Sequence, residues 1–172
     1  VVSGPVQAWI DDLSTSVGRF AFKSPASETA TEIYAISHFV GRAHARFLLL
    51  FVSLEALFKP AQRSAMAIVL VNSFIEATNS STLSESERSA ISSQLTFLRN
   101  ASIAQTGREL ASARLEGKKY LDKDPEDFFR YAYRIRNDIV HSADIDPTAL
   151  QNLVGEMDRF VSDILATEYV EP

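Results

Sequence analysis

The stretch FLLLFVSLEALF, residues 47–58, decides the fold class of this chain. Its apolar side chains occupy most sides of a helix with 3.6 residues per turn, which predicts a central, largely buried helix. The stretch is 12 residues long and contains Glu55. It is shorter than the roughly 20 apolar residues that cross a bilayer, so we expect a core helix and no membrane segment.

Apolar residues recur at helical spacing on both sides of this stretch. Residues 26–40 carry an apolar stripe of Ala30, Ile33, Ala35, Ile36 and Phe39. Further helices are expected over 65–75, from Ser84 to Leu98, over 102–116 before Gly117, from Asp124 through Ile139, and from Asp146 through Leu165. Ser84 with Glu87 has capping-box spacing, and Asp124-Pro125 and Asp146-Pro147 are typical helix starts.

No sustained strand-type alternation and no hairpin dipeptide such as Asn-Gly occurs, so the sequence predicts an all-α bundle of about six or seven helices. Residues 26–172 are expected to form this single bundle. Residues 1–25 are expected to be an N-terminal extension or short helix, with Val6, Trp9, Ile10 and Leu13 as its apolar positions. Pro60 is expected to end or restart a helix.

Composition narrows the possible functions. The chain of 172 residues has no cysteine, which excludes a disulfide scaffold and a thiolate metal site and is compatible with a cytoplasmic location. Its net charge of −5 argues against a uniformly basic surface. The first residue is Val1 and not methionine, as expected for a segment of a longer protein or for a trimmed chain.

Charge is unevenly distributed along the chain. Residues 99–136 carry 9 basic and 6 acidic groups, whereas residues 137–172 carry 1 basic and 8 acidic groups. At the end of the basic segment stands RYAYRIRNDIVH, residues 130–141. On a helix, Phe128, Ala132, Ile135 and Ile139 would face the core. Arg130, Arg134, Asn137 or Asp138, and His141 would form a second, polar stripe.

Two interpretations of this stripe stay open. In the first it is a solvated helix face, with Arg134 and Asp138 as an i, i+4 pair and His141 favoured at a helix C-terminus. In the second it is functional. Arg136 and His141 lie five positions apart, about 140° around an ideal helix, so they diverge unless the helix loosens before Ser142.

The segment Arg136-Asn137, followed by three residues and then His141, resembles the signature of the HEPN superfamily. The Leu54-Glu55-Ala56-Leu57 helix that precedes it is similar to that of the Apea-like HEPN branch. The resemblance spans residues 40–168 and departs at Ser142, where that branch often has glycine.

The resemblance implies a helical bundle that forms homodimers, in which two Arg/His sets meet in a cleft. It also implies metal-independent endoribonuclease activity in toxin–antitoxin, phage-defence or RNA-processing systems. His141 would transfer protons and Arg136 would bind the scissile phosphate, because imidazole titrates near neutral pH and guanidinium stays charged. Asn137 would orient the phosphate or His141, and Arg130 and Arg134 would hold flanking RNA phosphates.

Other assignments remain open beside this one. Glu55 is either a partner for an arginine of the 130–141 helix or an exposed acid at the bundle edge, and Asp138 is a supporting residue. The chain is alternatively a non-catalytic HEPN module that binds RNA or nucleotide or serves dimerisation and sensing, or a helical domain with a coincidental motif. His38 and His44 lack ligand spacing, so no metal and no cofactor is expected; an antitoxin or sensor protein is a further expected partner.

Overall fold

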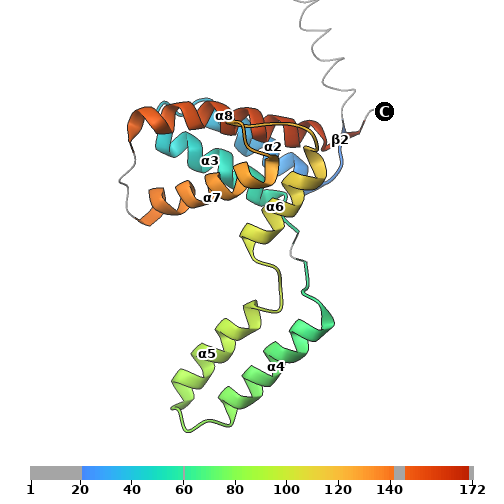
Figure 1. Ribbon diagram of the computed structural model, residues 1–172, viewed down its shortest axis with the longest axis vertical. Coiled ribbons are helices and arrows are strands. Elements are labelled where there is room, and N and C mark those ends of the chain that lie inside the picture. Colours follow the sequence, from blue (N-terminus) through green and yellow to red (C-terminus); the bar gives the residue numbers. More distant parts are fainter. Residues whose placement is uncertain (1–20, 60, 142–145, 171–172) are drawn as a thin grey trace, which may run out of the picture.

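The computed structural model describes residues 21–59, 61–141 and 146–170, which form seven α-helices and two two-residue strands. The all-helical fold class predicted from the sequence is therefore confirmed. Figure 1 shows most of the helices gathered in one bundle. In chain order the elements are β1 (Ala21–Phe22), α2 (Pro25–Ser37), α3 (Ala43–Ala56), α4 (Ala65–Asn79), α5 (Glu85–Phe97), α6 (Ile103–Arg114), α7 (Pro125–His141), α8 (Pro147–Ala166) and β2 (Tyr169–Val170).

The expected central helix is α3, which contacts α2, α6, α7 and α8. Its residues Phe47, Leu50, Phe51 and Leu54 are fully or almost fully buried. They join one apolar core with side chains of α7 and α8, among them Phe128, Phe129, Ala132, Leu153, Met157, Phe160 and Val161. Burial of large apolar side chains is the main stabilising contribution to such a bundle.

Several helices begin at the residues that the sequence indicated. The Ser84 hydroxyl accepts a hydrogen bond from the Glu87 amide, and the Glu87 carboxylate accepts one from the Ser84 amide, which completes the capping box. Asp146 caps α8 through the Thr148 amide. Pro125 starts α7, where its missing N–H costs no helical hydrogen bond.

The apolar stripe expected on residues 26–40 is wrong in part. Ala30 is buried, but Ile36 and Phe39 are exposed, and the face of α2 that packs inward is made of Ser27, Ala30 and Ser37. Small side chains let α2 approach α3 closely, and the Ser53 hydroxyl of α3 donates to the Ala30 carbonyl at 2.7 Å. On this face of α2, small side-chain size therefore determines which residues are buried, more than hydrophobicity does.

The α6–α7 contact is also close. A Cβ atom placed on Gly107 of α6 would lie 2.0 Å from Cζ of Phe129, far inside van der Waals contact. Glycine at this position therefore lets the ring of Phe129 rest against the backbone of α6.

Helices α4 and α5 have their main contact with each other. These helices pack against each other and extend away from the other five (Figure 1). We call them the α4–α5 hairpin. Apolar residues of α4 predicted a helix correctly, but they do not specify the surface on which it packs.

A short two-stranded sheet joins the two ends of the described chain, with Ala21 paired to Val170 and Phe22 to Tyr169 in antiparallel register. We call this sheet and the contacts beside it the terminal clasp. Beside it, the buried carboxylate of Glu168 accepts hydrogen bonds or ion-pair contacts from Ser27 and Arg114, each at 2.8 Å. No sequence pattern predicts these strands, because two residues are too few to show alternation.

Three expectations lie outside the described residues: the short helix around Trp9, the role of Pro60, and the chain path at Ser142–Asp144. Within the described ranges, no helix combines the length and the apolar character needed to cross a membrane.

Candidate functional site

Helix α7 carries every residue of the 130–141 motif, and α3 supplies Glu55. The helix is continuous from Pro125 to His141, so its residues point in directions fixed by the 100° step between neighbours. Phe128, Ala132 and Ile139 are buried, as predicted, and Ile135 is half-buried. The remaining motif residues fall into two groups, one against α3 and one on the open side of α7.

Arg136 belongs to the group against α3. Its Nη2 atom lies 3.3 Å from Oε1 of Glu55, and its Nη1 atom donates to Oδ1 of Asn137 at 3.2 Å. The side chains of Arg136 and Glu55 are 29% and 23% exposed, so this ion pair is partly shielded from water. Of the two alternatives for Glu55, the structure has the paired one, which links α3 to α7.

The exposed group forms a stripe along α7 that includes Arg130, Arg134 and His141. These residues lie within about 40° of one another around the helix axis. His141 is the last residue of α7 and is exposed, and its side chain has no hydrogen bond or ion pair to another side chain of the described ranges. Asp138 lies close to the same stripe and has an interaction of its own.

Arg130 and Arg134 line one surface depression of about 380 Å³ on the N-terminal half of α7, together with Lys123, Asp127 and Tyr131. Two cations lie over the Tyr131 ring: Lys123 Nζ is 5.6 Å and the Arg134 guanidinium carbon 5.5 Å from its centroid. Three cations and one carboxylate make this depression electropositive, which favours an anionic ligand. We call it the basic depression.

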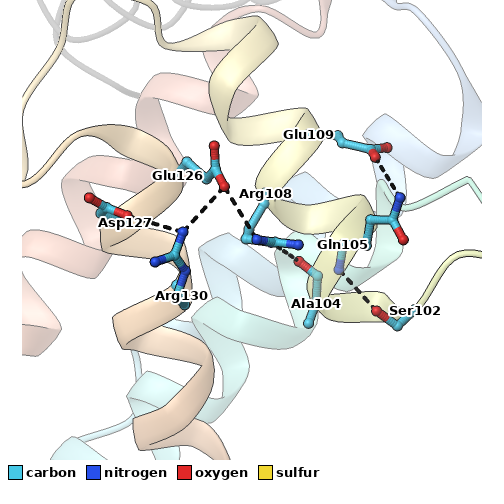
Figure 2. Close-up of polar contacts among 8 residues, drawn as sticks. All are labelled: Ser102, Ala104, Gln105, Arg108, Glu109, Glu126, Asp127 and Arg130. Atoms are coloured by element: carbon cyan, nitrogen blue, oxygen red, sulfur yellow. Dashed lines mark hydrogen bonds and ion pairs between the residues drawn. The ribbon is translucent and has the colours of Figure 1, made fainter.

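Arg130 is partly neutralised by acids of its own helix. Its Nη2 atom lies 3.4 Å from Oε1 of Glu126 and 3.2 Å from Oδ1 of Asp127. Figure 2 shows that Arg108 of α6 reaches the same Glu126 from the other side. Because the Arg130 side chain is 61% exposed, these pairs are weak and a phosphate can compete with them. Arg134 has no ion pair to a described residue and is the freer of the two.

One chain does not bring Arg136 and His141 together. Since α7 stays helical as far as His141, the two side chains leave the helix about 140° apart. Arg136 is directed at α3, and His141 ends the exposed stripe. The Asn137 side chain accepts from Arg136 and makes no side-chain hydrogen bond to His141 in the described part of the chain.

Sequence reasoning missed Lys123 and Tyr131. Lys123 precedes α7 and stands outside every expected helix, so helical periodicity does not reach it. Tyr131 follows Arg130 directly and lies at the margin of the exposed stripe of α7. Its contacts with Lys123 and Arg134 are visible only in the structure.

The two other histidines of the chain are His38, the C-cap residue of α2, and His44 in α3. His38 lies between Asp158 at 3.3 Å and Arg46 at 3.2 Å, and its ring packs edge-on against Tyr34. His44 lies in α3, as expected for a helix-face histidine. Among the residues that the structure describes, no group of histidine, aspartate and glutamate side chains is arranged to hold a metal ion.

Comparison of the chain with protein-family models, with curated proteins and with solved structures found no match. The site is therefore interpreted from its own residues and from the motif resemblance.

Proposed function

We propose that this chain is a metal-independent endoribonuclease of the HEPN type, which cleaves RNA by attack of a 2′-hydroxyl on the adjacent phosphate. The observation that supports this best is the exposed stripe of α7, in which His141 follows two arginines of the basic depression. A phosphodiester backbone lying along this stripe would meet cations first and an imidazole at the end of the helix.

His141 would act as the proton-transfer group in this reaction. Histidine exchanges protons near neutral pH, and in this chain its side chain is open to solvent and to a substrate. Arg136 would stabilise the extra negative charge on phosphate in the transition state. Glu55 and Asn137 would fix the guanidinium of Arg136 through the contacts at 3.3 and 3.2 Å.

Because Arg136 and His141 diverge within one chain, the proposal requires a homodimer. The HEPN resemblance implies such an arrangement, with two Arg/His sets meeting in a cleft. In that arrangement His141 of one copy would serve a phosphate bound by Arg136 of the other.

The basic depression would hold RNA flanking the cleavage point. Lys123, Arg130 and Arg134 supply charge for phosphates. Under this proposal the protein acts in the cytoplasm within a toxin–antitoxin, phage-defence or RNA-processing system. An antitoxin or sensor protein would be its regulator.

The test is an RNA-cleavage assay in excess EDTA on the wild type and on Arg136→Ala, His141→Ala and His44→Ala. His44→Ala is the matched control, since it removes an imidazole elsewhere in the bundle. The proposal predicts fragments ending in 2′,3′-cyclic phosphate from the wild type and the control only. Cleavage that persists in His141→Ala, with circular dichroism showing all variants folded, contradicts it.

The second candidate function is the non-catalytic HEPN module that binds RNA. The Arg136–Glu55 ion pair favours it, because a guanidinium that joins α3 to α7 has a structural role without any reaction. This candidate predicts RNA binding that falls when Arg134 becomes alanine, with no cleavage by the wild-type dimer. Arg134→Ala would reduce the salt dependence of binding, as expected for a lost phosphate contact.

A further inference from the structure

The Glu126 side chain, in the first turn of α7, lies at the boundary between two hollows of the surface. On one side is the basic depression, which its ion-pair partner Arg130 lines. On the other side is a hollow of about 410 Å³ along α6, which Glu126 itself lines. We call it the α6 hollow; its lining residues are Gln105, Arg108, Glu109, Ser112, Ala113 and Glu126.

Two arginines from different helices converge on one oxygen of Glu126. Nη1 of Arg108 is 3.3 Å and Nη2 of Arg130 is 3.4 Å from Oε1 of Glu126, so the two nitrogens are less than about 7 Å apart. Figure 2 shows Arg108 reaching this carboxylate from α6 and Arg130 reaching it from α7. Nε of Arg108 also donates to the Ala104 carbonyl of its own helix at 3.3 Å, which orients the guanidinium.

This pair of arginines has the geometry of an oxyanion site. Guanidinium groups bind phosphate through charge-assisted hydrogen bonds of about 2.7–2.9 Å, so one phosphate can contact both nitrogens at once. In the structure the Glu126 carboxylate occupies this position, with longer contacts of 3.3 and 3.4 Å. The three side chains are 37% to 61% exposed, so these ion pairs are weak and the carboxylate can be displaced.

We propose that Arg108 and Arg130 together bind one backbone phosphate of RNA, and that Glu126 competes with this phosphate for the two guanidinium groups. Arg108 is then a further residue that positions RNA, and the strand continues from the basic depression across the start of α7 to the α6 hollow. Without RNA, Glu126 holds the two arginines together. The inference rests on the proposed function, because it assigns another subsite to the same RNA.

The arrangement of the cations favours RNA over an acidic protein segment. Arg134, Arg130 and Arg108 follow one another from the middle of α7 to α6, and Lys123 lines the basic depression with the first two. RNA carries a phosphate at every nucleotide, so one strand can contact these cations in turn. An acidic peptide would only exchange one carboxylate for another between Arg108 and Arg130.

The first experiment measures the dissociation constant of a fluorescent oligouridine of about 12 nucleotides at several salt concentrations. All proteins carry His141→Ala, so that RNA is not cleaved during the measurement. Arg108→Ala is expected to raise the dissociation constant at least about threefold and to reduce its salt slope by about 0.7, the value for one phosphate of a single strand. Arg88→Ala is the matched control, because Arg88 belongs to α5 in the α4–α5 hairpin.

Two results of this experiment would overturn the inference. One is an Arg108→Ala variant that binds RNA as tightly as Arg88→Ala, and the other is a parent protein that binds no RNA. An oligoglutamate peptide that binds as tightly as RNA, and is weakened by Arg108→Ala, would identify an acidic protein as the ligand and would also overturn it. Circular dichroism establishes that each variant is folded.

The second experiment tests the competition by Glu126. Glu126→Gln removes the negative charge and keeps the size of the side chain, so it is expected to lower the dissociation constant at least about threefold. Glu116→Gln makes the same change of net charge at an exposed residue just after α6 and should have a smaller effect. The gain from Glu126→Gln should shrink in the Arg108→Ala background, since one of the two guanidinium groups is then absent. Equal gains from Glu126→Gln and Glu116→Gln would show that only net charge matters and would refute the competition.

Measuring cleavage and binding separately distinguishes this inference from the proposed function. If the wild type cleaves RNA and Arg108→Ala does not weaken binding, the inference is wrong and the nuclease stands. If Arg108→Ala weakens binding but the wild type does not cleave RNA, the nuclease is wrong. The subsite then belongs to the non-catalytic module.

Discussion

Replacing Gly107 by alanine should destabilise the protein, although alanine is the better helix former. The added Cβ would lie 2.0 Å from Cζ of Phe129 and 2.5 Å from both Cε atoms. The Phe129 ring is 1% exposed and packs among Phe51, Phe58 and Tyr133, with centroid separations of 5.5, 6.0 and 6.2 Å. These neighbours prevent the ring from swinging aside, so α6 and α7 must separate.

The expected magnitude follows from two opposing contributions. Overpacking a tight core contact costs about 1–3 kcal/mol, and replacing glycine by alanine inside a helix gains about 1 kcal/mol. Because three rings hold Phe129 in place, the overpacking cost should lie at the upper end of this range. We expect a net destabilisation of about 1–2 kcal/mol, which corresponds to a fall in Tm of several degrees for a chain of this size.

Gly155→Ala is the matched control, since α8 offers open space around its Cβ, with no heavy atom within 4 Å. It should stabilise the protein by about 0.5–1 kcal/mol through helix propensity alone. Urea unfolding followed by circular dichroism measures both variants. Combining Gly107→Ala with Phe129→Leu should recover part of the loss, because the smaller side chain makes room. If Gly107→Ala proves as stable as Gly155→Ala, the close α6–α7 contact is refuted.

Two further predictions concern hydrogen bonds of the bundle and of the hairpin. Tyr120→Phe removes the 2.6 Å hydrogen bond to the Asp163 carboxylate and should cost about 1–2 kcal/mol at pH 7. Burial and then Asp163 raise the pKa of Tyr120, so its stabilising contribution is complete below about pH 10 and declines as the pH rises above that value. Urea unfolding from pH 8 to 11 should therefore show the difference between wild type and variant narrowing, and a constant difference would contradict this account. Ser84→Ala removes the capping box of α5 and should destabilise the hairpin by about 1 kcal/mol. Hydrogen exchange should accelerate in α5 and stay unchanged in α3; equal acceleration in both would show that the hairpin unfolds only with the bundle.

Much of the fold was accessible from sequence because local signals agreed with one another. The apolar run at 47–58 predicted α3 as the central helix, and serine and aspartate caps with following acids or prolines located several helix starts. What the sequence left undetermined was the partner of each face. Helix α4 has apolar residues on two opposite sides, which predicts that both sides are buried. In the structure α5 covers one side, and the other side is exposed.

The prediction of an apolar stripe on residues 26–40 was wrong in part for a related physical reason. A hydrophobicity pattern favours Ile36 and Phe39, whereas close approach to α3 requires small side chains such as Ser27 and Ala30. A serine buried with its hydroxyl bonded to a backbone carbonyl looks like a surface residue in the sequence. A prediction from residue polarity alone therefore assigns the wrong face of α2 to the core.

At the candidate site, the 100° step between helical residues predicts that Arg136 points away from the stripe that ends at His141. Because α7 is continuous, the structure has this separation. The pairing of Glu55 with Arg136 crosses 81 residues, so the sequence offered it only as one of two alternatives. The basic depression depends on a lysine outside the helix and on ring contacts, which no one-dimensional pattern contains.

The terminal clasp has a mechanical consequence. Because Ala21 pairs with Val170 and Phe22 with Tyr169, a pulling force applied at both ends of the described chain would act at one edge of this antiparallel pair. The pairs would then separate one after another, as in a zipper, at a lower force than strands sheared along their length. The next contact to bear tension is the backbone hydrogen bond from Lys23 to the Glu168 carbonyl, followed by those of the Glu168 carboxylate with Ser27 and Arg114. Extension of the chain would thus open the clasp first and transmit force to α2 and α8 only afterwards.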